Sequence, residues 1–155
     1  RLEKNLRYVL NELVRGAYAL GGAGKHDEAI AQYTRLLQMH PRYANGYSYR
    51  AYSRSKKGEL ALAEDDYLRA IELDPNNVQS YRGLDHVLLQ QKRLDEILDH
   101  WGRYLKRHPN DSTALFERSG TYYRKGEIER AKRDISRACR LGKKQACETQ
   151  KRYFP

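Results

Sequence analysis

The sequence predicts an all-α protein made of repeated helix-turn-helix units. Two observations support this prediction: several columns of residues recur every 34 positions, and proline and glycine punctuate each period at fixed places. Periods of about 20–50 residues are typical of solenoid proteins, in which each repeat packs only against its neighbours. The recurring columns are prolines, mostly alanines and mostly aromatic residues: Pro41, Pro75 and Pro109; Ala29, Ala63, Ile97 and Ala131; Tyr33, Tyr67, Trp101 and Ile135.

Glycine marks the turn inside each repeat, at Gly24, Gly58 and Gly126, with Lys92 in the remaining slot. Glycine adopts positive φ angles without steric cost, so it ends the first helix of each pair. The prolines follow the second helix and stop it. The expected first helices are 3–22, 44–57, 78–91 and 112–125, the second helices are 26–39, 60–73, 94–107 and 128–141, and a last helix at 143–153 closes the stack.

The ends of the helices carry a second local signal. Asn77 and Asp111 each follow a proline by two residues, and both residue types are good N-caps for the next helix. A plain helical bundle is the alternative fold, but a bundle needs no fixed period. The punctuation therefore favours repeats.

Composition agrees with an elongated protein that has a thin core. The 155 residues are 39% hydrophobic and 32% charged, and their length suggests one domain over 1–155. No segment approaches the roughly 18 apolar residues that a membrane helix needs. No signal peptide is visible, which favours the cytoplasm. The chain begins with Arg1 and we interpret it as a fragment of a longer one, so compartment and oligomeric state stay open.

These residues resemble the tetratricopeptide repeat, whose pattern reads W-x2-L-G-x2-Y, then A-x3-F, then P. The second half of the pattern is well kept, as in Ala29, Tyr33 and Pro41, whereas the first half is looser. The W slot holds Leu13, Tyr47, Tyr81 and Leu115, and the small-residue slot holds Ala17, Ala51, Asp85 and Ser119. The resemblance implies a right-handed α-solenoid of about four repeats, at 10–43, 44–77, 78–111 and 112–145, with a C-terminal capping helix.

The third repeat departs from the pattern. Asp85 replaces the small residue, Ile97 replaces alanine, and Tyr104 stands where two other repeats have alanine. The added bulk should splay or shift this hairpin. We expect Asp85 to form a structural ion pair with Arg54 or Arg118, because an unpaired buried carboxylate is costly. Contact with water or with a ligand is the alternative.

The resemblance implies that the first helices line a concave face, where a protein or peptide partner binds. The residues expected there are polar, aromatic or basic, and the basic ones favour a partner with carboxylates. For the tyrosines, simple packing between repeats is the alternative. The expected partner-binding residues are Tyr18, Asn45, Ser48, Tyr49, Tyr52, Lys56, Gln79, Arg82, His86, Phe116, Tyr123 and Arg124, and Asn11, Val14, Gln90 and Gly120 share their stripe.

Two further functional expectations follow from the resemblance. Repeats that grip the acidic tails of heat-shock chaperones use a clamp of Lys, Asn and Arg, and none of the matching positions here carries the clamp residue. We therefore expect a different partner. The alternative function is an architectural or oligomerising segment that docks onto other domains of a larger chain. The clamp positions are Val14, Tyr18, Tyr49, Gln79 and Gly83.

The net charge of +10 is concentrated at the C-terminal end, where residues 112–155 carry 12 basic and 5 acidic side chains. A solvated outer face of the last repeat is the leading interpretation. Docking of an acidic protein or domain comes second. Nucleic-acid binding comes last, because no recognised nucleic-acid fold accompanies the charge.

Cysteine and histidine placement gives no catalytic, metal-binding or cofactor-binding set, so we expect no enzyme. The residues that come closest to a catalytic set are Arg82, Asp85 and His86. The stretch from Cys139 to Cys147 resembles the A-C-x-L-G-x-x-x-A-C segment of cysteine-rich helical repeats, which implies that the two cysteines face each other across a turn. They would bond in an exported protein and stay reduced in the cytosol, and we expect the reduced state.

Overall fold

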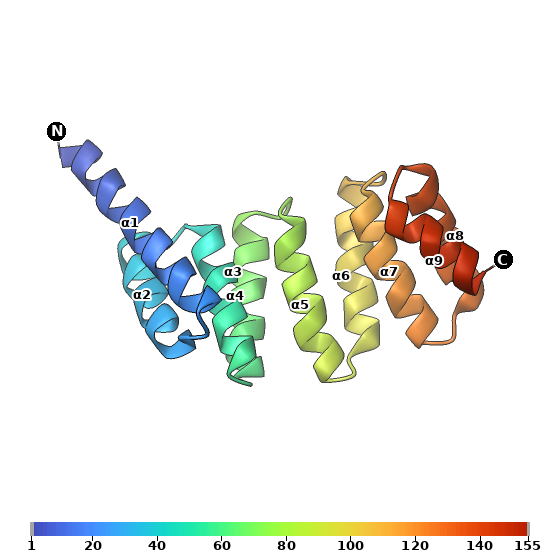
Figure 1. Ribbon diagram of the computed structural model, residues 1–155, viewed down its shortest axis with the longest axis horizontal. Helices are drawn as coiled ribbons and strands as arrows, with labels where there is room; N and C mark the ends of the chain where they lie inside the picture. Colours follow the sequence, from blue (N-terminus) through green and yellow to red (C-terminus); the bar gives the residue numbers. More distant parts are fainter. Residues whose placement is uncertain (1, 155) are drawn as a thin grey trace. The chain divides into compact units, whose positions relative to one another are not determined.

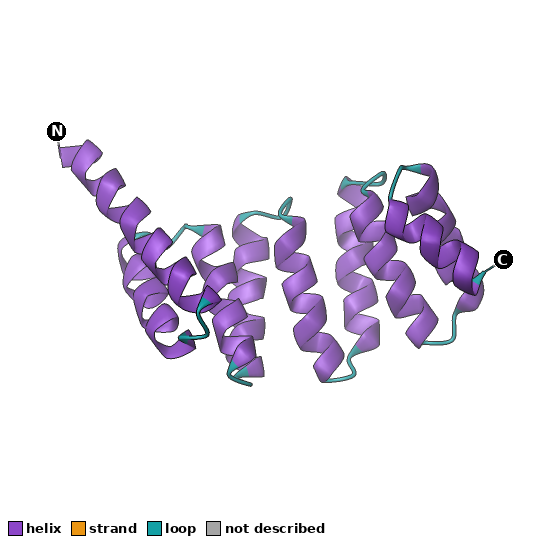
Figure 2. Cartoon of the chain, in the orientation of Figure 1, coloured by secondary structure: helices purple, strands orange, loops and turns teal. Residues whose placement is uncertain are grey.

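The computed structural model describes residues 2–154, with side chains for residues 8–154. All regular secondary structure in this part of the chain is α-helical, and short loops join the helices (Figure 1, Figure 2). Every predicted helix is present, with ends that differ by at most one residue from those expected. The helices are α1 (Leu2–Gly22), α2 (His26–Met39), α3 (Ala44–Lys56), α4 (Leu60–Leu73), α5 (Val78–Gln90), α6 (Leu94–Arg107), α7 (Ser112–Arg124), α8 (Ile128–Arg140) and α9 (Lys144–Tyr153).

The chain divides into two compact units, the N-terminal unit Arg1–Val87 and the C-terminal unit Leu88–Pro155. In the N-terminal unit, α1 packs on α2, α2 on α3, and α3 on α4. In the C-terminal unit, α6 packs on α7, α7 on α8, and α8 on α9. The boundary falls within α5, in the irregular third repeat. A single domain and a splayed third hairpin stay predictions.

Small residues allow the paired helices to cross closely. Ala29 and Ala63 are completely buried, as the alanine column predicts. The aromatic residues four positions later, Tyr33 and Tyr67, are buried as well, and burial raises the pKa of both phenols. Tyr67 lies against Gly83, where a Cβ atom would come within 2.3 Å of the tyrosine ring. The small and large residues of the repeat are therefore matched to one another.

Buried ion pairs join the two helices of the second and fourth repeats. Asp66 accepts two hydrogen bonds of 2.8 Å from Arg50 and a third of 2.8 Å from Arg54. Asp134 accepts bonds of 2.6 and 2.9 Å from Arg118, and this interaction raises the pKa of the Arg118 guanidinium. Only 5% of the Asp66 side chain and 10% of the Asp134 side chain is exposed. Each carboxylate is thus compensated inside its own hairpin.

The ion pairs of Asp66 and Asp134 use both arginines that were predicted to pair with Asp85. Asp85 is half-buried on α5. Arg54 and Arg118, the two candidate partners, donate to Asp66 and Asp134 of their own repeats. The structural ion pair of Asp85 stays a prediction.

The turns follow the glycine column. Gly24, Gly58 and Gly126 have φ angles of 76°, 78° and 78°, and Lys92 in the remaining slot has φ 58°. The left-handed conformation is therefore set by the shape of the hairpin and not by the residue. A side chain with a Cβ atom adopts it at a cost in free energy.

The predicted N-caps are confirmed. The Asp111 carboxylate accepts hydrogen bonds from the backbone N–H groups of Thr113 and Ala114, at 2.9 and 3.0 Å. The Asn77 side-chain oxygen accepts one from the N–H of Gln79, at 3.0 Å. These bonds satisfy donors that the first turn of a helix leaves free.

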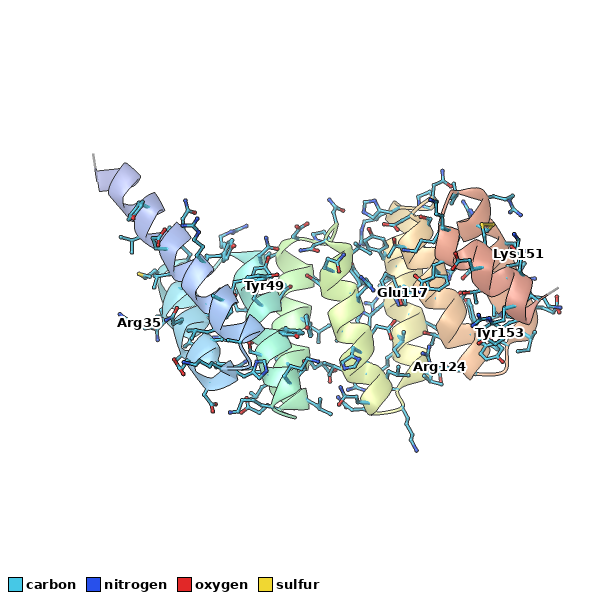
Figure 3. The ribbon with its side chains drawn as sticks, in the orientation of Figure 1. Arg35, Tyr49, Glu117, Arg124, Lys151 and Tyr153 are labelled. Atoms are coloured by element: carbon cyan, nitrogen blue, oxygen red, sulfur yellow. A yellow bond between two sulfur atoms is a disulfide. The ribbon has the colours of Figure 1, made fainter. Side chains whose placement is uncertain are left out.

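The expectation of two reduced cysteines is wrong for this structure, because Cys139 and Cys147 form a disulfide (the yellow bond in Figure 3). The turn between α8 and α9 brings them together. Gly142 has φ 89°, and the N–H of Lys143 donates back to the carbonyl of Ala138, at 3.0 Å. The resulting Cα–Cα distance between the cysteines is 4.7 Å. The bond fixes the start of α9 to the end of α8.

We predict that Asp66→Ala lowers the free energy of unfolding by about 3 kcal/mol, because it leaves two largely buried arginines without their counter-ion. Chemical denaturation followed by circular dichroism measures the change. Asp65→Ala is the matched control, since Asp65 is exposed, and should change stability by less than about 0.5 kcal/mol. Equal effects of the two substitutions would contradict a structural role for the buried pair.

We predict that Lys92→Gly raises the free energy of unfolding by about 0.5–1 kcal/mol, because glycine removes the steric cost of the positive φ angle. Gly126→Lys at the equivalent turn makes the reverse change. It should destabilise by a similar amount, since a Cβ atom there meets no other heavy atom within 4 Å and only the backbone is affected. Changes of the same sign in the two thermal melts would refute this explanation.

We predict that Cys139→Ala combined with Cys147→Ala lowers the free energy of unfolding by about 2–3 kcal/mol, the loop-closure entropy expected for a short loop. A reducing agent should have the same effect on the wild-type chain and none on the variant. Rapid labelling of both cysteines by a thiol reagent in the native, unreduced protein would show that the bond is absent.

Candidate functional site

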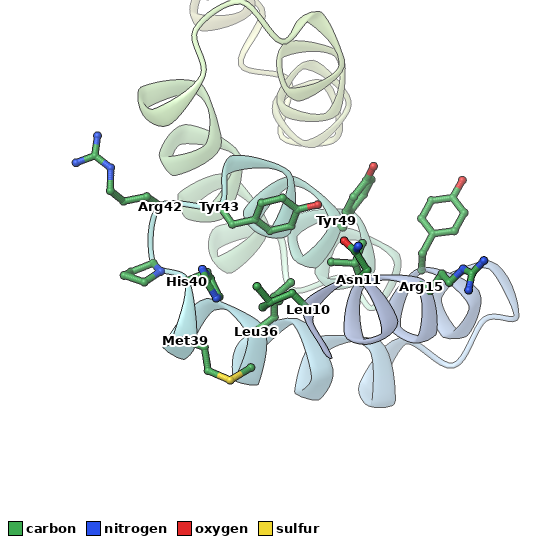
Figure 4. A pocket seen from close by; sticks show the side chains of 12 residues that line it. Leu10, Asn11, Arg15, Leu36, Met39, His40, Arg42, Tyr43 and Tyr49 are labelled. Atoms are coloured by element: carbon green, nitrogen blue, oxygen red, sulfur yellow. The ribbon is translucent and has the colours of Figure 1, made fainter. Parts of the chain in front are cut away.

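A pocket of about 860 Å³ lies in the N-terminal unit, between α1, the end of α2 and the beginning of α3 (Figure 4). This N-terminal pocket has mainly apolar walls with polar groups at its rim, the usual makeup of a ligand-binding cleft. Its lining residues are Leu10, Asn11, Val14, Arg15, Tyr18, Leu36, Met39, His40, Pro41, Arg42, Tyr43 and Tyr49.

Tyrosines form one side of the N-terminal pocket. The ring of Tyr49 meets the ring of Tyr18 edge-on at 5.6 Å and lies 5.7 Å from that of the buried Tyr33. Tyr18 is 64% exposed, so most of its ring is free to meet a partner. Burial raises the pKa of Tyr43. Tyr49 thus packs against the buried ring of Tyr33, and part of its own ring lines the pocket.

The charged groups around the N-terminal pocket are basic. Arg15 and Arg42 line it, and none of the described side chains that line it is an aspartate or a glutamate. Arg15 lies 3.2 Å from Glu12 on the exposed face of α1, while Arg42 points away from the pocket (Figure 4). The Nε2 atom of His40 is buried and has no hydrogen-bond partner. The pocket therefore offers polar groups at its edge.

Two of the predicted binding residues form side-chain hydrogen bonds within the N-terminal unit, and their part in binding stays a prediction. Ser48 is buried, and its hydroxyl lies 2.6 Å from the hydroxyl of Ser80. Asn45 accepts a hydrogen bond of 3.0 Å from the side-chain amide of Asn77. Both pairs join α3 to the beginning of α5. Their polar groups thus satisfy hydrogen bonds between successive first helices.

Tyr52 and Lys56 lie near the other end of α3, away from the N-terminal pocket. The Tyr52 ring is 47% exposed and meets the ring of His26 edge-on at 6.3 Å. The Lys56 ammonium lies 5.4 Å from the centre of the same ring, a cation–π contact. These residues form a small exposed cluster of their own.

The predicted residues of α5 are exposed on one helix. Gln79 accepts a hydrogen bond of 3.3 Å from Arg82, and His86 follows one turn later. They are not among the residues that line the N-terminal pocket. Their part in binding stays a prediction.

A smaller pocket of about 400 Å³ lies in the C-terminal unit, between α7, α8 and α9. Of the predicted residues, it brings together Phe116, Tyr123 and Arg124, and Gly120 lies between them on the same face. The Tyr123 ring lies 6.4 Å from that of Tyr153 and 6.0 Å from that of Phe154. We call it the C-terminal pocket; its lining residues are Phe116, Glu117, Ser119, Gly120, Tyr123, Arg124, Ile135, Thr149, Tyr153 and Phe154.

Sequence reasoning missed residues that reach the pockets from other helices. Leu36 and Met39 come to the N-terminal pocket from the end of α2, and Tyr153 and Phe154 come to the C-terminal pocket from the end of α9. The repeat pattern assigns binding residues to first helices alone. The exposed aromatic residues near the chain end were the only available signal.

Some kinds of site are not formed by the described residues. No helix within residues 2–154 is long and apolar enough to cross a membrane. Among the side chains that the structure describes, no group of three or more His, Cys, Asp or Glu residues is placed to hold a metal ion.

Known proteins with similar sequences contain the same repeat. Residues 14–78 match the family model of the tetratricopeptide repeat. The human tetratricopeptide repeat protein 13 is 29% identical over 143 residues, which cover 87% of this chain and 16% of that protein. Hsp70-Hsp90 organizing protein 1 of Glycine max is 32% identical over 91 residues, which cover 59% of this chain and 16% of that protein. The chain thus spans a small part of the length of these relatives.

Solved structures with the same fold include those of MamA. A crystal structure of MamA gives a TM-score of 0.75 at 19% identity and covers 88% of this chain and 80% of that chain. MamA from Desulfovibrio magneticus RS-1, from residue 41 to its end, gives 0.70 at 15% identity and covers 86% and 75%. At this identity the likeness concerns the fold alone. The family match over residues 14–78, the sequence relatives and the helical hairpins agree that the chain contains tetratricopeptide repeats.

Proposed function

We propose that this protein-interaction scaffold binds an extended segment of a partner protein in the N-terminal pocket. The observation that carries the proposal is the pocket itself: about 860 Å³ of space with apolar walls, bordered by the exposed Tyr18 and the half-buried Tyr49. Aromatic residues in such surroundings supply much of the binding energy at protein interfaces, because they bury a large area and lose little conformational entropy.

The walls and the rim have different parts in this proposal. An apolar side chain of the partner would enter between Leu10, Val14 and Leu36, where it exchanges water for hydrocarbon contacts. The Tyr49 hydroxyl and the Asn11 amide at the rim would bond to the partner's backbone, which fixes its register. None of the described side chains that line the pocket is acidic, which favours a partner that carries a carboxylate near the apolar anchor.

The names of some relatives suggest one partner class, which the residues here do not favour. The Hsp70-Hsp90 organizing protein is named for two chaperones. Among the clamp positions of this chain, Gly83 lies under the Tyr67 ring, so no longer side chain fits there without moving that ring. Tyr18 and Tyr49 occupy two others, with rings in place of basic or amide groups. We therefore propose a partner other than chaperone tails.

The test begins with selection of binding peptides from a random library on the wild-type chain. We predict that the selected peptides bind Tyr49→Ala about 10- to 100-fold more weakly in isothermal titration, the loss typical of an aromatic anchor. Tyr123→Ala is the matched control, because it removes an exposed tyrosine from the C-terminal pocket. It should leave the affinity unchanged.

Two outcomes would overturn the proposal. If no peptide is enriched, or if the enriched peptides bind Tyr49→Ala as well as the wild type, the N-terminal pocket is not the binding site. The architectural alternative would then lead. Thermal melts of both variants exclude loss of folding as the cause of lost binding.

A further inference from the structure

The outer face of α8 carries a row of four arginines. Arg130, Arg133, Arg137 and Arg140 follow one another at spacings of three and four residues, which place them on one side of a helix. The row is about 15 Å long. The opposite face of α8, with Ala131, Asp134, Ile135 and Ala138, is buried. All four arginines are exposed, so the row is open to a partner.

In α2 and α4, three of these four positions are neutral or acidic, whereas the slot of Arg137 holds arginine in every repeat, at Arg35, Arg69 and Arg103. The slot of Arg133 holds Ala31, Asp65 and Asp99, and the slot of Arg140 holds Gln38, Glu72 and Lys106. In net charge, α4 has −3 and α8 has +3. Solubility requires polar residues on an outer face but no particular sign. Solubility therefore does not require the positive charge of α8.

The arginines are only partly neutralised within the unit. Arg130 lies 3.0 Å from Glu127, and Arg137 donates to the neutral side chain of Asn110 at 2.9 Å. Arg133 and Arg140 form no ion pair with the described residues. Like charges three and four residues apart on a helix repel one another, so the row costs stability unless a partner supplies the counter-charge.

We propose that the arginine face of α8, formed by Arg130, Arg133, Arg137 and Arg140, binds an acidic α-helical segment of a partner protein. A helix with carboxylates every three or four residues repeats the spacing of the arginines. The planar guanidinium group of each arginine donates two parallel hydrogen bonds to a carboxylate. This face is separate from both pockets.

Two neighbouring features favour a protein over nucleic acid. Leu141, directly after the row, is 41% exposed, and a protein segment can bury it whereas a phosphate backbone cannot. The nearest ring, Tyr122, lies between Arg118 and Arg130 at 5.6 and 5.7 Å, so both guanidinium groups occupy the faces on which a base would stack.

The disulfide holds the end of the row in place. Cys139 lies between Arg137 and Arg140 in the last turn of α8, and its bond to Cys147 anchors that turn to α9. Helix ends otherwise fray. An anchored last turn keeps Arg137 and Arg140 in register with the rest of the row, which lowers the entropy lost on binding.

The experiment uses the whole chain and two synthetic helical peptides of about 20 residues. One peptide carries glutamates on a single face at spacings of three and four residues, and the other has the same composition in shuffled order. We predict that the first peptide binds about tenfold more tightly in isothermal titration. Arg133→Glu with Arg140→Glu should remove this preference and weaken binding by at least about tenfold.

A matched control separates the row from net charge. Lys151→Glu with Arg152→Glu on α9 changes the net charge by the same amount without touching the row, and should alter the affinity by less than about twofold. Arg133→Lys with Arg140→Lys keeps the charge but removes the paired donors, so it should weaken binding by about three- to fivefold. Melting curves verify that each variant is folded.

Three results would overturn the proposal. Equal loss in the α8 and α9 charge reversals would show that only net charge matters. Equal affinity for the ordered and shuffled peptides would exclude recognition of a helical face. If a single-stranded RNA of about 12 nucleotides binds more tightly than the ordered glutamate peptide, and the α8 charge reversal removes this binding, the face would be assigned to nucleic acid instead. None of these results bears on the N-terminal pocket.

Discussion

The close crossing of paired helices at buried small residues is the constraint on which the rest of the structure depends. In the N-terminal unit, Ala17, Ala29, Ala51 and Ala63 are at most 1% exposed. A larger side chain at any of them would push two helices apart, because protein interiors are packed too densely to absorb an extra methylene group. Close crossing also brings Arg50 within reach of Asp66, sixteen residues away, and leaves gaps that only large rings fill.

Polar residues then divide between the interior and the surface. Ser48 and Asn45 join successive first helices, and Asp66 neutralises two arginines inside a hairpin. Buried polar groups must be paired, since an unpaired one loses its hydrogen bonds to water without replacement. Side chains paired in this way have fewer free hydrogen-bonding groups to offer a partner. The residues left at the surface include Tyr18, Tyr52 and the arginines of α8, and these are available to partners.

The two units offer different surfaces. The N-terminal unit carries a net charge of +2 and the larger, mainly apolar pocket, whereas the C-terminal unit carries +8 and the arginine face of α8. Apolar pockets give affinity that depends little on salt, while exposed charges act at longer range and weaken as salt rises. A scaffold with both can hold an extended segment at one surface and an acidic helix at the other.

The sequence by itself determined the helices, their turns and their caps, because these depend on residues within a few positions of each other. The 34-residue period placed every helix end to within one residue, and it marked Lys92 as the exception in the glycine column. The tertiary structure alone decided that Ser48 lies inside, that Tyr153 and Phe154 meet Tyr123, and that Cys139 bonds to Cys147. Those outcomes depend on how separate helices pack, and a repeat pattern gives the order of the helices but not the side chains that their packing brings together.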